Sequence, residues 1–276
     1  MTAKRPRVGL NTVLVIYVLI SVYPIVFMLT NAFKNGLQTA ANPFAVAFSQ
    51  PFGSNFALAW QAIAPDFFRS VYIVAVSVAG IVLFAMLSAY AFARLEFPLK
   101  KFLFHAVFAL LLVPGFLVLI PLFLEIKNMG LLNTPWGLIL PYIAGSQAFA
   151  IFVFRTFIAA IPGDLFEAAR IDGANDLQMF ARLVIPLSVP VMVTIALLNI
   201  NGIWGDYVLP SLILDPSHAT VAVAVVNFQP PQDAPSLNAG NMQLAAFTVA
   251  SIPIAALFLF LMRYFVAGLT SGAMKM

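Results

Sequence analysis

Seven stretches of this chain run for more than about 20 residues without a charged side chain, and they constrain the fold more than any other feature. A helix needs about 20 predominantly apolar residues to cross a bilayer. Six of these runs suit one spanning helix each. The seventh, 35–65, has Asn, Gln, Pro and Gly scattered through it, so we expect loop and short interfacial pieces there. We therefore predict six membrane spans, at about residues 10–33, 70–93, 102–124, 137–157, 184–205 and 242–262.

The composition agrees with a membrane protein. Only 9% of the residues are charged and 62% are hydrophobic, whereas a soluble domain is roughly one quarter charged. So few charges cannot cover a globule with a polar surface. This excludes a soluble enzyme, a nucleic-acid-binding protein and a disordered chain. We expect an all-α integral membrane protein with residues 1–276 in a single transmembrane domain.

Lysine and arginine predict the orientation. Six spans put both termini on one side, and that side then carries 11 of the 14 basic residues. Basic residues gather in cytoplasmic segments, so we expect both termini in the cytoplasm. The opposite side has only Lys34, Arg69 and Lys127. It has two long loops, about 34–69 and 206–241.

Several chemistries are absent from the sequence. There is no cysteine, and the two histidines, His105 and His218, are far apart. No glycine precedes a lysine, so the phosphate-binding G-x-x-x-x-G-K-[ST] loop cannot form. The interiors of the predicted spans lack the ionisable groups that proton-driven carriers use. We expect no enzyme activity and no bound cofactor or metal, and an energy source outside this chain.

One cytoplasmic loop, residues 158–183, is rich in charge. The spacing predicts two short helices, the first capped by Asp164 with Glu167 three residues later. Gly173 lies where the first helix should end, because glycine enters the left-handed conformation without strain. Asn175, with Gln178 three residues later, is expected to cap the second helix.

The residues of the first helix leave two interpretations open. Ala168 and Ala169 are small enough to let another surface approach closely, and the charges around them can fix the register of docking. A solvated amphipathic loop would have the same pattern. The residues alone do not decide between these interpretations.

A longer pattern over this loop resembles a known family. Glu167-Ala168-Ala169, Asp172-Gly173-Ala174, Phe180, Ile185-Pro186-Leu187 and Pro190 are similar to the "EAA" loop of binding-protein-dependent ABC importer permeases. The resemblance implies a type I permease fold in a prokaryotic inner membrane, with the loop docked on a separate ATPase subunit. It assigns that coupling role to Glu167, Ala168, Ala169, Arg170, Asp172, Gly173, Ala174 and Phe180.

Three further segments resemble the second permease subunit of maltose-type carbohydrate importers: residues 91–98, 137–142 and 266–275. The resemblance covers nearly the whole chain. It implies a second permease subunit, two ATPase subunits that bind ATP and Mg, and an extracytoplasmic sugar-binding protein as partners, besides membrane lipid. It also implies a second ATPase contact at the C-terminus, through Gly268, Thr270, Ser271, Gly272 and Lys275.

Polar residues within apolar spans are the candidates for a sugar path. They are Tyr142, Gln147, Asn199, Asn201 and Trp204. Each could instead serve as an interhelical hydrogen bond or an interfacial anchor. The family often has Trp-Asn where this chain has Trp204-Gly205, so no role of that asparagine carries over. The loop around 215–238 resembles the segment that reaches into the binding protein.

The expected function is therefore permeation of a sugar or oligosaccharide, coupled to ATP hydrolysis on other subunits. Three alternatives stay open: an ABC importer permease for a non-sugar solute, a stand-alone secondary carrier or channel, and an intramembrane hydrolase. The hydrolase is disfavoured because His105 is near a span end and His218 is in a loop.

Overall fold

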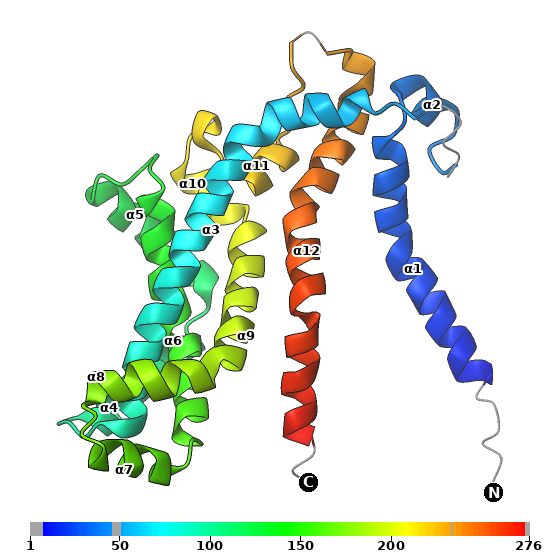
Figure 1. Ribbon diagram of the computed structural model, residues 1–276. Coiled ribbons are helices and arrows are strands. Elements are labelled where there is room, and N and C mark those ends of the chain that lie inside the picture. The colour runs from blue at the N-terminus through cyan, green and yellow to red at the C-terminus, as the bar shows by residue number, and fades with distance from the viewer. Residues whose placement is uncertain (1–7, 46–50, 233, 274–276) are drawn as a thin grey trace, which may run out of the picture. The chain divides into compact units, whose positions relative to one another are not determined.

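The computed structural model describes residues 8–45, 51–232 and 234–273, with side chains described up to residue 260. Every regular element in these ranges is a helix (Figure 1). The elements are α1 (Val8–Ala32), α2 (Gly36–Ala41), α3 (Ser54–Arg94), α4 (Lys100–Ala109), η1 (Leu110–Leu112), α5 (Gly115–Asn128), α6 (Trp136–Ala159), α7 (Gly163–Ile171), α8 (Asp176–Met179), η2 (Phe180–Val184), α9 (Ile185–Trp204), α10 (Val208–Ile213), η3 (Pro216–His218), α11 (Val221–Val226), η4 (Ser236–Asn238) and α12 (Ala239–Ala273).

Within the described residues, five helical stretches are long and apolar enough to cross a membrane: Asn11–Ala32, Ser54–Arg94, Trp136–Ala159, Asp176–Trp204 and Ser236–Phe260. The predicted third span, 102–124, is not one straight helix. Instead, Lys100–Leu112 and Gly115–Asn128 meet at an angle of 102°. The break is at Pro114, which lacks a backbone N–H, and the preceding Val113 is extended with ψ 115°. Only if this bent pair counts as one span does the number of candidate spans reach six.

The helix α3 begins about 16 residues before the predicted second span, at Ser54. We had expected loop and short interfacial pieces over residues 35–65, because Asn, Gly and Pro are frequent there. Asn55, Ala59 and Ile63 form a buried stripe at four-residue spacing, which is the period of one helix face. This stripe outweighs Pro65, which lies inside the helix.

The chain divides into two compact units, Met1–Pro65 with Ala224–Ile252, and Asp66–Val223 with Pro253–Met276. Polar contacts hold the first unit together. The buried Lys34 donates through Nζ to Asn31 Oδ1 (3.2 Å) and to the carbonyl oxygens of Asn42 (3.1 Å) and Pro43 (3.3 Å). Asn241 Nδ2 donates to the Asn31 carbonyl at 2.7 Å. These bonds fix the end of α1 against the start of α12.

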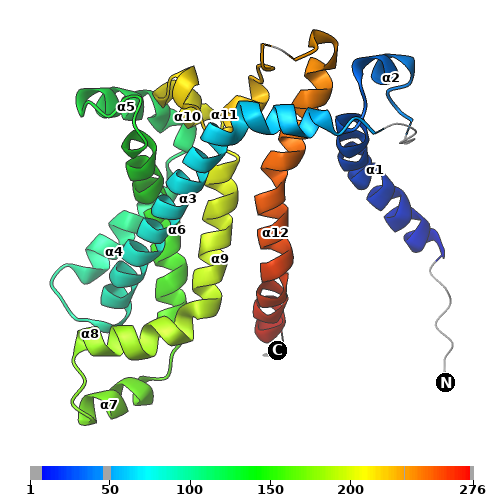
Figure 2. The ribbon, with the colours of Figure 1, turned by 45° about the horizontal axis from the view of Figure 1, so that its top comes forward.

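The second unit contains a bundle formed by α6, α9 and most of α3. Ala85 and Ala89, small residues four apart on α3, are fully buried, which suits close helix contact. A Cβ on Gly80 would lie 2.5 Å from Ile143 Cδ1, so α3 and α6 approach closely there. Figures 1 and 2 place α7 and α8 at one end of this bundle, and α10 at the other. The charged loop is therefore at the opposite end from the 206–223 segment.

Candidate functional site

The charged loop forms two short helices, as predicted, but the first begins differently from the prediction. α7 starts at Gly163 after an extended Pro162, and no side chain caps it. The predicted Asp164 cap is therefore wrong. Pro162 can start the helix because its ring fixes φ and its missing N–H leaves no donor unsatisfied. Asp164 lies in the first turn instead, where a carboxylate interacts favourably with the helix dipole.

The turn after α7 depends on Gly173, whose φ is +81°. Its backbone N–H donates to the Arg170 carbonyl at 3.0 Å, and the N–H of Ala174 donates to the Ala169 carbonyl at 2.9 Å. These two bonds form a Schellman motif and satisfy the last carbonyls of the helix. A Cβ added at Gly173 would meet no atom within 4 Å, so the requirement for glycine comes from the backbone alone.

The predicted cap of the second helix is confirmed. Asn175 Oδ1 accepts from the Gln178 N–H at 2.9 Å, and Gln178 Oε1 accepts from the Asn175 N–H at 2.9 Å. This reciprocal capping box fixes the direction of α8 relative to the turn. Short-range hydrogen bonds thus fix the backbone on both sides of the turn at Gly173.

Most of the predicted coupling residues lie on an open surface. Glu167, Ala168, Arg170, Asp172 and Gly173 are exposed, and Ala169 and Ala174 are half-buried. The apolar side chains of Ile171 (87% exposed) and Leu177 (70%) also face outward. A surface that combines exposed apolar and charged groups suits a protein partner.

Phe180 differs from the rest of the predicted set. It is buried, and its ring lies 5.5 Å from that of Tyr90 on α3, measured between ring centres. Within the described chain it packs the end of α8 against α3. Its contribution to the loop is therefore positioning.

Arg94, the last residue of α3, anchors the loop and was not recognised from the sequence as doing so. Its guanidinium donates to the carbonyl of Ile158 at 2.8 Å and also to that of Ile161. The same group lies 4.1 Å from the centre of the Phe166 ring on α7. The side chain of Phe166 is buried beneath it. Arg94 therefore ties the end of α3 to the end of α6 and to the buried face of α7.

A π-helical turn, η2, connects α8 to α9. The backbone N–H of Ile185 donates to the carbonyl of Phe180, five residues earlier. Pro186 follows and has no N–H to donate, so the regular bonding pattern cannot continue across this point. The loop is thus joined to the long helix α9 through a short irregular segment.

The predicted sugar-path residues are on α6 and α9, two helices that pack against each other. The Tyr142 hydroxyl donates to Asp206 Oδ2 at 2.8 Å. The amides of Gln147 and Asn199 donate to the carbonyls four residues earlier, Ile143 and Ile195. Trp204 is buried and meets Phe67 edge-on at 5.4 Å, whereas Asn201 is exposed.

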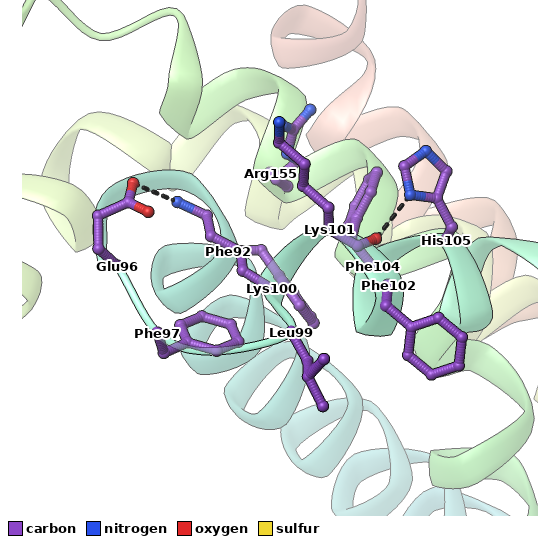
Figure 3. Close-up of a pocket in the computed structure, with 10 residues that line it drawn as sticks. All are labelled: Phe92, Glu96, Phe97, Leu99, Lys100, Lys101, Phe102, Phe104, His105 and Arg155. Atoms are coloured by element: carbon purple, nitrogen blue, oxygen red, sulfur yellow. Dashed lines mark hydrogen bonds and ion pairs between the residues drawn. The ribbon is translucent and has the colours of Figure 1, made fainter.

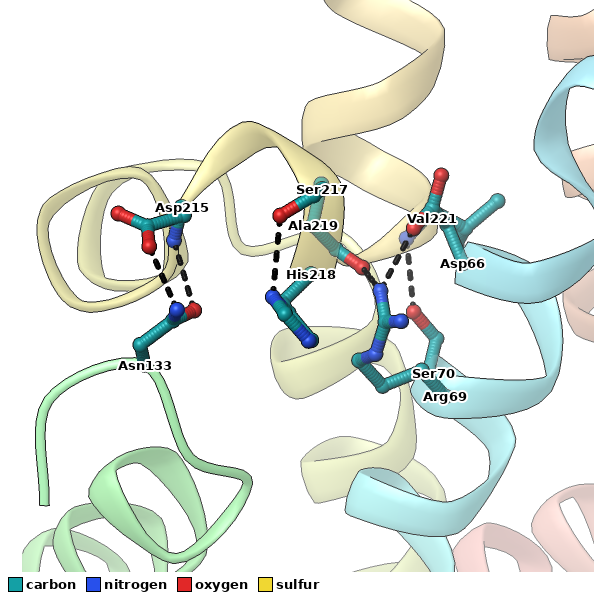
Figure 4. Close-up of polar contacts among 9 residues, drawn as sticks. All are labelled: Asp66, Arg69, Ser70, Asn133, Asp215, Ser217, His218, Ala219 and Val221. Carbon is teal, nitrogen blue, oxygen red and sulfur yellow. Dashed lines mark hydrogen bonds and ion pairs between the residues drawn. The ribbon is translucent and has the colours of Figure 1, made fainter.

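At the bundle end opposite α7, hydrogen bonds hold the segment around residue 215 in place (Figure 4). Asn133 Nδ2 donates to Asp215 Oδ2 at 2.5 Å, and Asn133 Oδ1 accepts from the Asp215 N–H at 3.1 Å. Arg69 on α3 bonds Asp66 at 2.7 Å and the Ala219 carbonyl at 2.8 Å. The segment from Asp215 to Ala219 is thus fixed at both ends.

Most of the predicted C-terminal contact lies in the last turns of α12. The backbones of Gly268, Thr270, Ser271 and Gly272 belong to α12, but their side chains are outside the described residues. Lys275 also lies outside the described residues.

Comparison with known proteins identifies relatives. The family model of the binding-protein-dependent transport system inner membrane component matches residues 81–271. The chain is 34% identical over 202 residues to the diacetylchitobiose uptake system permease protein NgcG of Streptomyces coelicolor, covering 72% of this chain and 67% of that one. It is 33% identical over 264 residues to the probable ABC transporter permease protein YurM of Bacillus subtilis, covering 95% and 86%.

Solved structures show the same fold. A chain of a bacterial ABC transporter involved in import of the acidic polysaccharide alginate superposes with a TM-score of 0.83 at 20% identity, covering 96% of this chain and 99% of that one. A bacterial alginate ABC transporter in complex with an alginate-pentasaccharide-bound periplasmic protein gives 0.64 at 17% identity, covering 91% of each chain. The region that the family model matches, residues 81–271, includes α7, the turn at Gly173 and α8.

Proposed function

Because the chain belongs to the family of binding-protein-dependent transport system inner membrane components, we propose that it is a permease subunit of an ABC importer for a sugar or oligosaccharide. It would form half of the translocation path beside a second, homologous permease subunit. The energy would come from two ATPase subunits that bind ATP and Mg. An extracytoplasmic sugar-binding protein would deliver the solute.

One observation carries this proposal: the exposed helix–turn–helix of α7 and α8 is fixed at the end of the bundle. Arg94 holds its buried face, Gly173 and Asn175 define its turn, and the family match includes it. Such a rigid surface segment can transmit a movement of a soluble partner to the long helices of the bundle. ATP-driven closure of the ATPases would then shift the bundle between its two states of access.

The proposed substrate class is supported by the relatives. One similar permease is named for diacetylchitobiose uptake. In this chain the predicted spans are uncharged in their interiors, which suits a neutral solute. Tyr142, Gln147, Asn199, Asn201 and Trp204 remain the proposed polar lining of the path.

The coupling role is tested in the complex reconstituted in vesicles with its ATPases and binding protein. Glu167→Lys and Gly173→Val should leave membrane insertion and assembly intact and abolish substrate-stimulated ATP hydrolysis. Glu125→Lys repeats the charge change on exposed α5. Gly130→Val repeats the backbone strain at another positive-φ glycine (+70°) with free space around it. Both controls should keep the stimulation, and normal stimulation in both coupling variants would falsify the assignment.

The substrate class needs a separate measurement. The binding protein that co-purifies with the complex should bind oligosaccharides in a calorimetric screen that also includes amino acids, peptides and polyols. A preference for a non-sugar solute would keep the assignment as an ABC importer permease and change the proposed substrate class. Transport by the chain without any ATPase would indicate a secondary carrier.

A further inference from the structure

A pocket of about 860 Å³ opens beside the coupling loop, between the α3–α4 connection, α4 and α6 (Figure 3). It is separate from the exposed surface of α7 and from the proposed sugar path. Arg94 bonds the end of α3 to the end of α6, so the pocket lies at the same end of the bundle as α7. Nothing in the proposed transport mechanism uses it.

The pocket has more positive than negative charge. Lys100 is paired with Glu96 at 2.9 Å and also donates to the Leu95 carbonyl at 2.7 Å. Among the described residues, no carboxylate pairs with Lys101 or Arg155. Two cations are therefore available to an anion.

The Arg155 side chain is held in place, but one of its hydrogen-bond donors has no partner in the described residues. Its guanidinium lies 4.5 Å from the centre of the Phe104 ring. Its Nε is buried and has no hydrogen-bond partner in the described part of the chain. A buried donor without a partner costs free energy, and an incoming acceptor would remove that cost. Guanidinium groups bind phosphate oxygens well, through parallel N–H donors.

An apolar track leaves the pocket along the same two helices. Phe108 follows Phe104 by one turn of α4, and Phe152 precedes Arg155 by one turn of α6. Their rings are 5.3 Å apart, and both side chains remain exposed. The cationic head of the pocket thus continues into an exposed aromatic surface.

We propose that this pocket binds the headgroup of an anionic phospholipid. The phosphate would accept hydrogen bonds from Arg155 and Lys101, and an acyl chain would lie along the track of Phe108 and Phe152. Free inorganic phosphate has the same headgroup chemistry, but it would make no use of the apolar track. Basic pockets between spans on the cytoplasmic side suit anionic lipid. The assignment of this pocket to the cytoplasmic leaflet rests on the proposed orientation of the chain. The pocket itself does not depend on that orientation.

Native mass spectrometry of the purified complex tests the proposal, with phosphatidylglycerol and phosphatidylcholine of identical acyl chains as probes. The wild type should retain phosphatidylglycerol preferentially. Each cation near a charged lipid surface contributes about a fivefold change in affinity. Lys101→Gln should lower the preference by about that factor, and Lys101→Gln with Arg155→Gln by roughly 25-fold. Arg155→Lys keeps the charge but loses the parallel N–H donors, so its preference should lie between those of the wild type and Arg155→Gln.

Controls make the outcome specific. Arg182→Gln removes an exposed cation of η2 outside the pocket and should leave the preference unchanged. Lys101 is exposed, so its substitution tests the site even if the Arg155 variant fails to assemble. Equal retention of both lipids by the wild type, or the same loss in Arg182→Gln, would overturn the proposal. Displacement of the lipid by excess inorganic phosphate would also overturn it, in favour of a free-anion site.

Discussion

Arg94 and Phe166 meet in a cation–π contact, with 4.1 Å between the guanidinium carbon and the ring centre. The same guanidinium bonds the backbone at the end of α6. One side chain therefore joins a long helix, a helix end and the buried face of the loop. Together with the contact between Phe180 and Tyr90, this residue joins the loop to α3.

We expect Arg94→Met to loosen α7 without unfolding the bundle, since methionine keeps most of the volume. The substitution removes two charged hydrogen bonds, and losing even one of them costs about 2 kcal/mol of local stability. That corresponds to roughly thirtyfold faster hydrogen exchange in α7 and a weaker stimulation of ATP hydrolysis by substrate. Hydrogen–deuterium exchange of the complex measures the first effect directly.

Lys127→Met is the matched control, because it removes an exposed basic residue on α5. It should leave exchange in α7 unchanged. Unchanged exchange in the Arg94 variant would show that the loop is held by its other contacts.

Asn175→Ala should fray α8. The substitution removes the acceptor for the Gln178 N–H and costs about 1 kcal/mol. Asn175→Asp keeps an oxygen at that position and should behave as the wild type. Exchange rates of the Gln178 and Met179 amides distinguish the two variants. If alanine and aspartate gave the same rates, the cap would not stabilise α8.

Local rules predicted the details of the loop well. The left-handed Gly173 and the capping box of Asn175 and Gln178 follow from short-range backbone chemistry. The start of α7 was wrong by two residues, because Pro162 can precede a helix without a side-chain cap. The beginning of α3 was missed, because Asn, Gly and Pro obscured a buried stripe with four-residue spacing.

Long-range contacts could not be predicted in the same way. The carbonyl acceptors of Arg94 are 64 and 67 residues away. Every residue has a backbone carbonyl, so residue types do not indicate which carbonyl will accept. Tyr142 and Asp206 are also 64 residues apart. The sequence indicated only that a polar residue in an apolar span needs a partner. Which partner it finds depends on how α6 and α9 pack.

Tyr142→Phe should destabilise the protein through Asp206. It removes a hydrogen bond to a carboxylate, at a cost of about 1.5–3 kcal/mol. In an Asp206→Ala background the same substitution should cost almost nothing. Thermal unfolding of the four proteins of this double-mutant cycle measures the coupling.

The same variant tests the proposed sugar path. Tyr142 is one of the proposed lining residues, and its hydroxyl, which donates to Asp206, can still accept from a sugar hydroxyl. We therefore expect the KM for transport to rise several-fold in Tyr142→Phe, whereas an unchanged KM would remove Tyr142 from the proposed lining.

The last prediction concerns Asn133, which adopts a left-handed backbone conformation (φ +59°) and bonds Asp215 twice. Asn133→Gly keeps the backbone conformation and removes both side-chain bonds. Asn133→Ala removes the bonds and adds backbone strain of about 1 kcal/mol. Both should expose the segment from Asp215 to Ala219 to limited proteolysis, with alanine the more sensitive. If that segment helps to receive the binding protein, both variants should also weaken the stimulation of ATP hydrolysis by the loaded binding protein. Asn42→Gly, in the other compact unit, is the control and should not change cleavage at this segment. Equal protease resistance in all three variants would mean that Arg69, through its bond to the Ala219 carbonyl, holds the segment without Asn133.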